Sequence, residues 1–217
     1  MDGLLYSFRR CPYAMRARMA LAQSGANPEH REIVLRNKPT HMLELGQRGT
    51  VPLLALEDGT VMEESLEIMD WALRRDDPEN WLRNREDPNL CELLAHNDGP
   101  FKGDLDRYKY PERFPDDDPA YLDGARSRAV KHLEAIDARL VEPYLDGGRP
   151  GFFDAAIFPF IRQFSAVDRE WFASLPLERL IDWRGRMLEH PHFTRVMKKV
   201  AVWSEGDVPI GFVSTLR

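Results

Sequence analysis

The chain has 217 residues, of which 43% are hydrophobic and 30% charged, so it is long enough for two small domains with real cores. Its net charge of −6 argues against a nucleic-acid partner, because phosphate contacts need a concentrated basic face. No apolar run approaches the ~18 residues of a membrane helix, and the first residues lack the basic segment of a secretory signal. We therefore expect a soluble, cytoplasmic protein that binds neither membrane nor nucleic acid.

A helix follows the first predicted strand. Residues 4–8 read as a buried strand, and Pro12 then suits the first turn of a helix, where its missing N–H costs nothing. Apolar residues keep a helical spacing over residues 13–24, and Gly25 ends the helix. The side chains expected to face solvent are Arg16, Arg18 and Gln23.

Further elements complete an N-terminal domain. They are predicted as a strand over residues 32–35, a short helix over 39–46, strands over 53–56 and 60–62, and a helix over 65–75. Asp58 and Gly59 lie between the last two strands and form a strong hairpin turn signal. A β-α-β unit followed by a β-β-α unit is the thioredoxin-like arrangement, which we assign to residues 1–76.

The second half of the chain is predicted to be helical. Residues 77–87 are polar and punctuated by proline, as a linker would be, so the second domain is placed at 88–217. Its helical patterns cover residues 89–108, 119–145, 153–164, 176–189 and 191–200. The predicted fold is thus α/β followed by all-α. Residues 116–118 are three aspartates without ligand-spaced partners, so no metal site is predicted.

The two cysteines, Cys11 and Cys91, lie far apart in the sequence, which predicts a reducing compartment and no structural disulfide. Cys91 stands among leucines and is expected to fill core. Cys11 stands at a helix N-terminus, where N–H donors and the helix dipole favour a reactive thiolate. From this context alone, a buried packing role for Cys11 is as good an interpretation. With Ala14 in place of a second cysteine, any disulfide exchange at Cys11 must be completed by an external thiol.

Two other short motifs have both an ordinary structural interpretation and a functional one. Val51-Pro52 precedes a strand; a cis bond there would offer its backbone to an extended peptide, and an ordinary trans proline would not. Glu64-Ser65 is a good helix start, or a site for the amino and carboxylate groups of an amino acid. Lys38, taken alone, is a solvated lysine.

Together these motifs resemble the cysteine-type members of the glutathione transferase superfamily over essentially the whole chain. The run Cys11-Pro12-Tyr13-Ala14 resembles the Cys-Pro-aromatic-Ala site of omega-class transferases and is also similar to two-domain bacterial glutaredoxins. The resemblance implies that Cys11 forms a mixed disulfide with glutathione. It further implies glutathione contacts from Tyr13 beside the thiol, from Leu35, from Lys38 at the glycyl carboxylate, from Val51 and Pro52 at the cysteinyl backbone, and from Glu64 and Ser65 at the γ-glutamyl end.

The second domain carries one departure from this family pattern. The segment from Phe153 to Pro159 resembles the family helix with an N-capping box and a buried aspartate, here Asp154, to which we assign a structural role. Gly151 stands where the family has Ser or Thr, so the hydroxyl half of the box is missing. Phe164, Trp171 and Trp183 are candidate walls of an acceptor site or, more simply, core residues.

The favoured function is a glutathione-dependent thiol transferase or reductase with one nucleophilic cysteine, an enzyme with glutathione as cosubstrate and no metal. Its partner would be a small-molecule or protein-thiol acceptor. The first alternative is conjugation of glutathione to electrophiles, for which Tyr6 or Ser7 could supply a hydroxyl. The second is a binding or regulatory protein without turnover. The resemblance allows a homodimer or a monomer.

Overall fold

The computed structural model describes residues 1–216, which form two compact units. Residues 1–80 make the first unit together with residues 188–216, and residues 81–187 make the second. This division differs from the predicted domain limits at the C-terminal end. Helix α11 (Pro191–Val196) packs against α1 (Pro12–Ser24), and the C-terminal segment, residues 197–216, hydrogen-bonds along strand β2.

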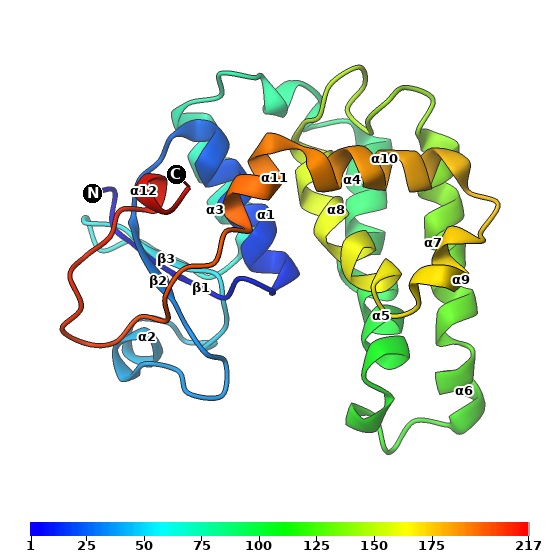
Figure 1. Cartoon of the computed structure of the whole chain (residues 1–217), viewed down its shortest axis with the longest axis horizontal. Helices are drawn as coiled ribbons and strands as arrows, with labels where there is room; N and C mark the ends of the chain where they lie inside the picture. Colours follow the sequence, from blue (N-terminus) through cyan, green and yellow to red (C-terminus); the bar gives the residue numbers. More distant parts are fainter. Residues whose placement is uncertain (217) are drawn as a thin grey trace. The chain divides into compact units, whose positions relative to one another are not determined.

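The first unit is built on a four-stranded sheet, as the thioredoxin-like prediction requires (Figure 1). Its strands are β1 (Leu4–Ser7), β2 (Glu29–Glu32), β3 (Leu53–Ala55) and β4 (Val61–Met62), in the order β2-β1-β3-β4. Strands β1 and β2 are parallel, whereas β1–β3 and β3–β4 are antiparallel. Helices α1 and α3 (Ser65–Arg75) cover one face, and α2 (Thr40–Leu45) lies beyond the other.

The position of the second strand was predicted wrongly. The strand occupies residues 29–32, three residues before the predicted 32–35. Its sequence is polar throughout, yet His30 and Glu32 are buried, because the turn before α1 and the C-terminal segment supply polar partners. Of the apolar residues after it, Ile33 stays buried and donates its N–H to the Ser7 carbonyl, whereas Val34 and Leu35 enter a turn that the Asn37 N–H closes by donating to the Val34 carbonyl at 2.9 Å.

The solvent face expected for α1 does not exist. Arg16, Arg18 and Gln23 are only 2%, 1% and 5% exposed, because α1 is packed between α3 and α11. The buried guanidinium groups are hydrogen-bonded to protein groups, which is the condition for burying charge without a large desolvation cost. Helical periodicity fails for α1 because both faces of the helix are covered.

The second unit is helical, as predicted. Its helices are α4 (Pro88–His96), α5 (Lys102–Lys109), α6 (Pro119–Asp123), α7 (Ala125–Arg139), α8 (Phe152–Ser165), α9 (Arg169–Ala173) and α10 (Glu178–Glu189). A π-helical turn, Asn97–Phe101, interrupts the predicted helix 89–108 at Pro100, which has no N–H to donate. Two short helices, α9 and α12 (Phe212–Thr215), were not predicted. Within residues 1–216, no helix combines the length and apolarity needed to cross a membrane.

Asp154 has the structural role assigned to it. The carboxylate is fully buried and accepts hydrogen bonds from the N–H groups of Leu145 and Gly151 and from the Trp183 indole, at 2.8, 3.0 and 2.7 Å. The missing half of the capping box is supplied by Asp146, whose Oδ2 accepts from the Phe153 and Asp154 N–H groups. Trp183 therefore belongs to the core and is no acceptor wall.

The remaining core assignments are mixed. Phe164 is buried, while Trp171 is half-buried and packs edge-on against it. Neither Cys11 nor Cys91 forms a disulfide. Cys91, expected in the core, is only half-buried, because α4 turns Leu90 and Leu94 inward and leaves Cys91 to donate to the Arg85 carbonyl at 3.5 Å.

Candidate active site

Cys11 lies at the end of the turn that joins β1 to α1. Cys11 is the N-cap residue with an extended backbone, and Pro12 is the first helical residue. The Cys11 side chain makes no capping hydrogen bond to the helix, and its Sγ lies 3.5 Å from the Val51 carbonyl oxygen. The residue is half-buried, so the sulfur combines a helix N-terminus with partial access.

Val51 and Pro52 lie beside this sulfur. The peptide bond between them is cis, which the sequence left open. Val51 belongs to an apolar cluster with Tyr6, Ile33, Met42 and Leu53, and Cys11 packs against the same cluster. The structure therefore brings together three of the predicted site residues, Cys11, Val51 and Pro52.

A second group forms at the start of α3. Ser65 Oγ accepts a hydrogen bond from Arg16 Nε at 2.9 Å, and both side chains are buried. The Arg16 guanidinium also lies 5.1 Å from the centre of the Tyr13 ring. Tyr13 and Ser65 are thus joined through Arg16, which sequence reasoning missed as a site residue. Its i,i+3 spacing from Tyr13 was the available signal.

Glu64 stands exposed next to Ser65 and forms an ion pair with Arg48. Arg48 was also missed, because it lies in the loop after α2 with no local pattern to mark it. The neighbouring Glu63 holds this loop by accepting from the Gln47 and Arg48 N–H groups, each at 3.0 Å. An anionic and a cationic side chain therefore meet at the predicted γ-glutamyl end.

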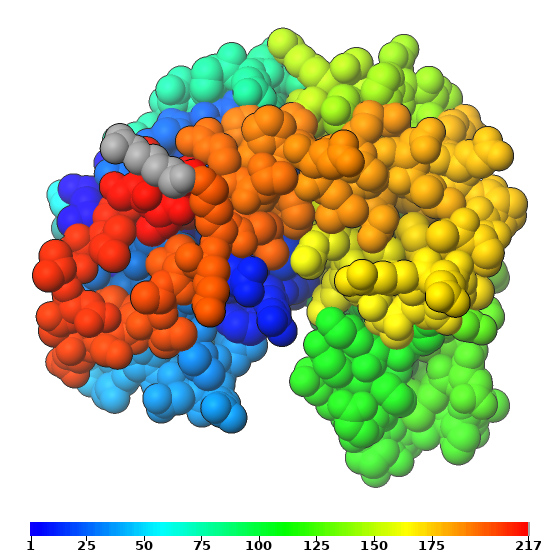
Figure 2. All heavy atoms as spheres, viewed as in Figure 1, coloured from blue at the N-terminus to red at the C-terminus, as the bar shows by residue number. Residues whose placement is uncertain are grey.

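Lys38 lines a pocket of about 910 Å³. One wall is the stretch from β2 to α2, and the other is part of the C-terminal segment, which Figure 2 shows in orange to red over the first unit. The residues along the pocket include Arg31, Lys38, His41, Trp203 and Asp207. Leu35 is not among the lining residues; it sits at the exposed tip of the turn after β2.

The two hydroxyls that could stabilise a ligand thiolate are both fully buried. The Tyr6 hydroxyl accepts from Arg31 Nη1 at 2.9 Å and forms a second hydrogen bond with His41 Nδ1, also at 2.9 Å. Burial raises the pKa of Tyr6. Ser7 Oγ accepts from Arg18 Nη1 at 2.5 Å. Both hydroxyls are committed to protein partners.

Among residues 1–216, no cluster of three or more His, Cys, Asp or Glu side chains is arranged to hold a metal ion.

Comparison with known proteins agrees with the fold. Residues 5–81 match the model of the family "Glutathione S-transferase, N-terminal domain", and residues 119–199 match "Glutathione S-transferase, C-terminal domain". The chain is similar to glutathione S-transferase omega-1 of Mus musculus, with 28% identity over 86% of this chain and 77% of the mouse protein. It is also similar to glutaredoxin 2 of Escherichia coli, with 25% identity over 75% of this chain and 85% of the bacterial protein.

Among solved structures, the chain resembles a glutathione transferase of Phanerochaete chrysosporium determined in complex with oxidized glutathione. The TM-score is 0.74 at 17% identity, covering 90% of this chain and 94% of the fungal one, which establishes a common fold. The two family models together span more than half of the chain. The protein therefore belongs to the glutathione S-transferase superfamily of enzymes.

Proposed function

We propose that the chain is a glutathione-dependent thiol transferase whose single nucleophile is Cys11. The Cys11 thiolate attacks the glutathione sulfur of a mixed disulfide; the substrate sulfur leaves as a thiolate and takes up a proton, while glutathione stays bonded to Cys11. A second glutathione thiolate then attacks the glutathione sulfur of that bond. Oxidised glutathione leaves, and the Cys11 thiolate is restored.

The observation that carries this proposal is the setting of the Cys11 sulfur. It is half-buried, at the N-terminus of a 13-residue helix, and 3.5 Å from the carbonyl of the Val51-Pro52 loop. Since Ala14 replaces a second cysteine in the motif, the mixed disulfide cannot be resolved by a neighbouring thiol. Glutathione itself must complete the cycle.

The bound glutathione would extend from Lys38 past the Val51-Pro52 loop to Glu64 and Ser65. Its cysteinyl backbone would pair with the Val51 loop, and its glycyl carboxylate would meet Lys38, with Tyr13 and Leu35 as further contacts. Its γ-glutamyl carboxylate would accept from Ser65. The γ-glutamyl amino group would bind Glu64 in place of Arg48 or beside it.

Conjugation to electrophiles is less well supported. That reaction needs a hydroxyl or similar donor at the thiolate of glutathione, and the Tyr6 and Ser7 hydroxyls are both fully buried and bonded to protein groups. The similarity to proteins named omega-1 transferase and glutaredoxin 2 also supports thiol transfer. We expect a small-molecule or protein-thiol acceptor, in a cytoplasmic compartment that supplies reduced glutathione.

The test uses two matched variants, Cys11→Ser and Cys91→Ser. Each reduced protein is incubated with oxidised glutathione, and its intact mass is measured by mass spectrometry. Thiol transfer is then assayed with a glutathionylated peptide and reduced glutathione. We expect Cys11→Ser to lose both the glutathione adduct and the transfer activity, and Cys91→Ser to keep both. A Cys11→Ser variant with wild-type transfer activity would show that another group is the nucleophile.

A further inference from the structure

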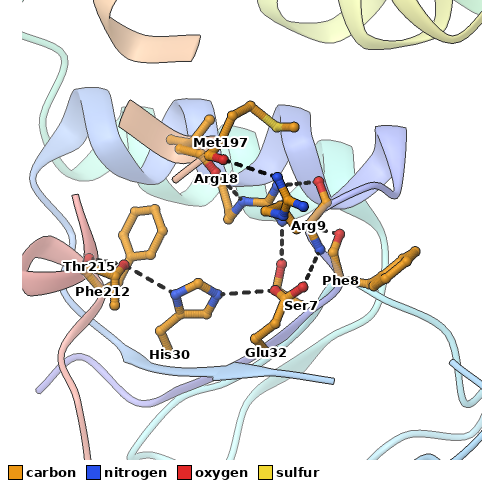
Figure 3. A network of polar contacts seen from close by, with 10 residues as sticks. Ser7, Phe8, Arg9, Arg18, His30, Glu32, Met197, Phe212 and Thr215 are labelled. Atoms are coloured by element: carbon orange, nitrogen blue, oxygen red, sulfur yellow. Dashed lines mark hydrogen bonds and ion pairs between the residues drawn. The ribbon is translucent and has the colours of Figure 1, made fainter. Parts of the chain in front are cut away.

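Arg18 is a buried cation that takes no part in the steps of the proposed reaction. It extends from α1 and is 1% exposed. Its guanidinium donates to Ser7 Oγ at 2.5 Å, to the Arg9 carbonyl at 2.9 Å, and to the Phe8 and Val196 carbonyls at 3.3 Å each. A guanidinium offers five N–H donors in a fixed fork, so one side chain reaches the end of β1, the turn before Cys11 and the end of α11 (Figure 3).

Glu32 on β2 supplies the opposite charge. Its Oε1 accepts from the Arg9 N–H at 2.7 Å. The backbone of Arg9 is therefore bound on both sides, because its carbonyl accepts from Arg18. The Cys11 N–H in turn donates to the Phe8 carbonyl at 3.0 Å. Residues 8–11 are therefore clamped between one buried cation and one buried anion.

The other charged groups facing Arg18 belong to the turn and to β2. Arg9 is the cation in the turn; its Nη1 donates to the Met197 carbonyl at 3.4 Å, beside the Val196 carbonyl that Arg18 binds. His30 lies 3.8 Å from Glu32 Oε2, and burial together with Arg18 lowers the pKa of His30 to about 3, so His30 is neutral at pH 7. Burial lowers the pKa of Arg18 to about 10, while the interactions with Glu32 and with a charged Cys11 act in the opposite direction. Arg18 is thus protonated at pH 7, and its positive charge would attract a thiolate at Cys11.

We propose that Arg18 is a positioning residue for Cys11: it clamps the turn of residues 8–11 to α11 and, with Glu32 as counter-charge, keeps a buried positive charge near the sulfur that favours the thiolate. This inference rests on the proposed function only in taking Cys11 as the nucleophile. A residue with a purely structural role would change the stability of the fold and leave the ionisation of Cys11 where it is.

The test measures the ionisation of Cys11 without glutathione. Iodoacetamide alkylation of Cys11 is followed by peptide mass spectrometry from pH 4 to pH 10, which separates Cys11 from Cys91. We compare Arg18→Met with Arg31→Met. Arg31 is also an arginine of the first unit with hydrogen bonds and a stacking contact to Trp203, but it points to the opposite face of β2.

In Arg18→Met we expect the apparent pKa of Cys11 to rise by about one unit, the lower end for removal of a nearby opposite charge. Thiolate nucleophilicity rises with thiol pKa with a slope of about 0.45, so alkylation should be about threefold slower at low pH and about threefold faster on the alkaline plateau. A merely loosened site would not produce profiles that cross. Arg31→Met should keep the wild-type profile.

Two further variants guard against misfolding of Arg18→Met, which near-UV circular dichroism would reveal. Arg18→Lys keeps the positive charge but not the forked set of donors, so the pKa of Cys11 should lie closer to the wild-type value than in Arg18→Met. Glu32→Gln keeps an acceptor for the Arg9 N–H but removes the negative charge, so the pKa of Cys11 should fall. An unchanged Cys11 pKa in folded Arg18→Met, or in Glu32→Gln, overturns the inference. Retained transfer activity in Cys11→Ser would sink the proposed function instead, since alkylation needs no glutathione.

Discussion

Restoring the hydroxyl half of the capping box should destabilise this protein. Gly151 precedes α8 with an extended backbone, φ −149°, that serine could adopt. A Cβ at this position would lie only 2.6 Å from Cγ of Asp146. The carboxylate of Asp146 occupies the space of the family's Ser or Thr side chain and accepts from Phe153 N at 2.8 Å and Asp154 N at 3.3 Å. Gly151 and Asp146 therefore form one capping device.

The magnitudes follow from these contacts. Gly151→Ser overpacks a buried site and should cost about 1–3 kcal/mol of unfolding free energy. Asp146→Ala leaves two buried N–H groups without an acceptor and should cost about 2–5 kcal/mol. In the double variant the serine hydroxyl has room to accept from Asp154 N, as in an ordinary capping box, so only the Phe153 N–H remains unmatched. We expect the double variant to be more stable than Asp146→Ala, with a favourable coupling of about 2–4 kcal/mol.

The assay is urea unfolding of the full chain, followed by tryptophan fluorescence and by far-UV circular dichroism so that separate unfolding of the two units is detected. Wild type, both single variants and the double variant complete the cycle. Additive free energies, with the double variant less stable than either single one, would refute the idea that Asp146 replaces the hydroxyl.

Three further predictions concern the first and second units. Lys38→Met should raise the KM for glutathione about tenfold, the loss of one charge-assisted bond, with an unchanged Cys11 alkylation rate; steady-state kinetics that show a fall in kcat alone would contradict it. Tyr6→Phe should leave thiol transfer within about threefold of wild type, since its buried hydroxyl binds Arg31 and His41; a loss of transfer on the order of a hundredfold would revive a hydroxyl mechanism. Burial lowers the pKa of His132 to about 3. The unfolded chain therefore binds more protons below pH 7, so acidification destabilises the fold. His132→Gln should recover about 2 kcal/mol of the stability lost between pH 7 and pH 5; equal losses in both proteins would exclude this account.

The sequence predicts the fold well where local signals agree. The hairpin turn between β3 and β4, the start of α1 at Pro12 and the full length of α3 all follow from residues within a few positions. The prediction fails for β2, whose polar residues are buried only because remote elements pair with them. For the same reason, the sequence does not indicate that residues 188–216 pack with the first unit, because no local pattern marks a partner almost the whole chain away.

The site divides in the same way. Cys11, Tyr13 and Ser65 stand in recognisable motifs at helix starts, and the structure sets Tyr13 and Ser65 on a common partner. That partner is Arg16, which periodicity assigned to solvent. A buried arginine is costly unless its donors find acceptors, and those acceptors come from elements that the sequence cannot bring together by pattern alone.

The start of α1 explains why those remote partners matter for reactivity. Helices α4, α6 and α9 begin at Asp87, Asp118 and Asp168, whose carboxylates accept from the first N–H groups. Helix α1 begins at Cys11, which makes no such bond. An aspartate at position 11 would stabilise the helix by about 1 kcal/mol, but its carboxylate would bind the first N–H groups of α1. With cysteine at this position, those N–H groups can instead stabilise a thiolate or bind a ligand. The turn of residues 8–11 is instead held by Arg18 and Glu32, which bind the Arg9 carbonyl and N–H and leave the start of α1 to the Cys11 sulfur.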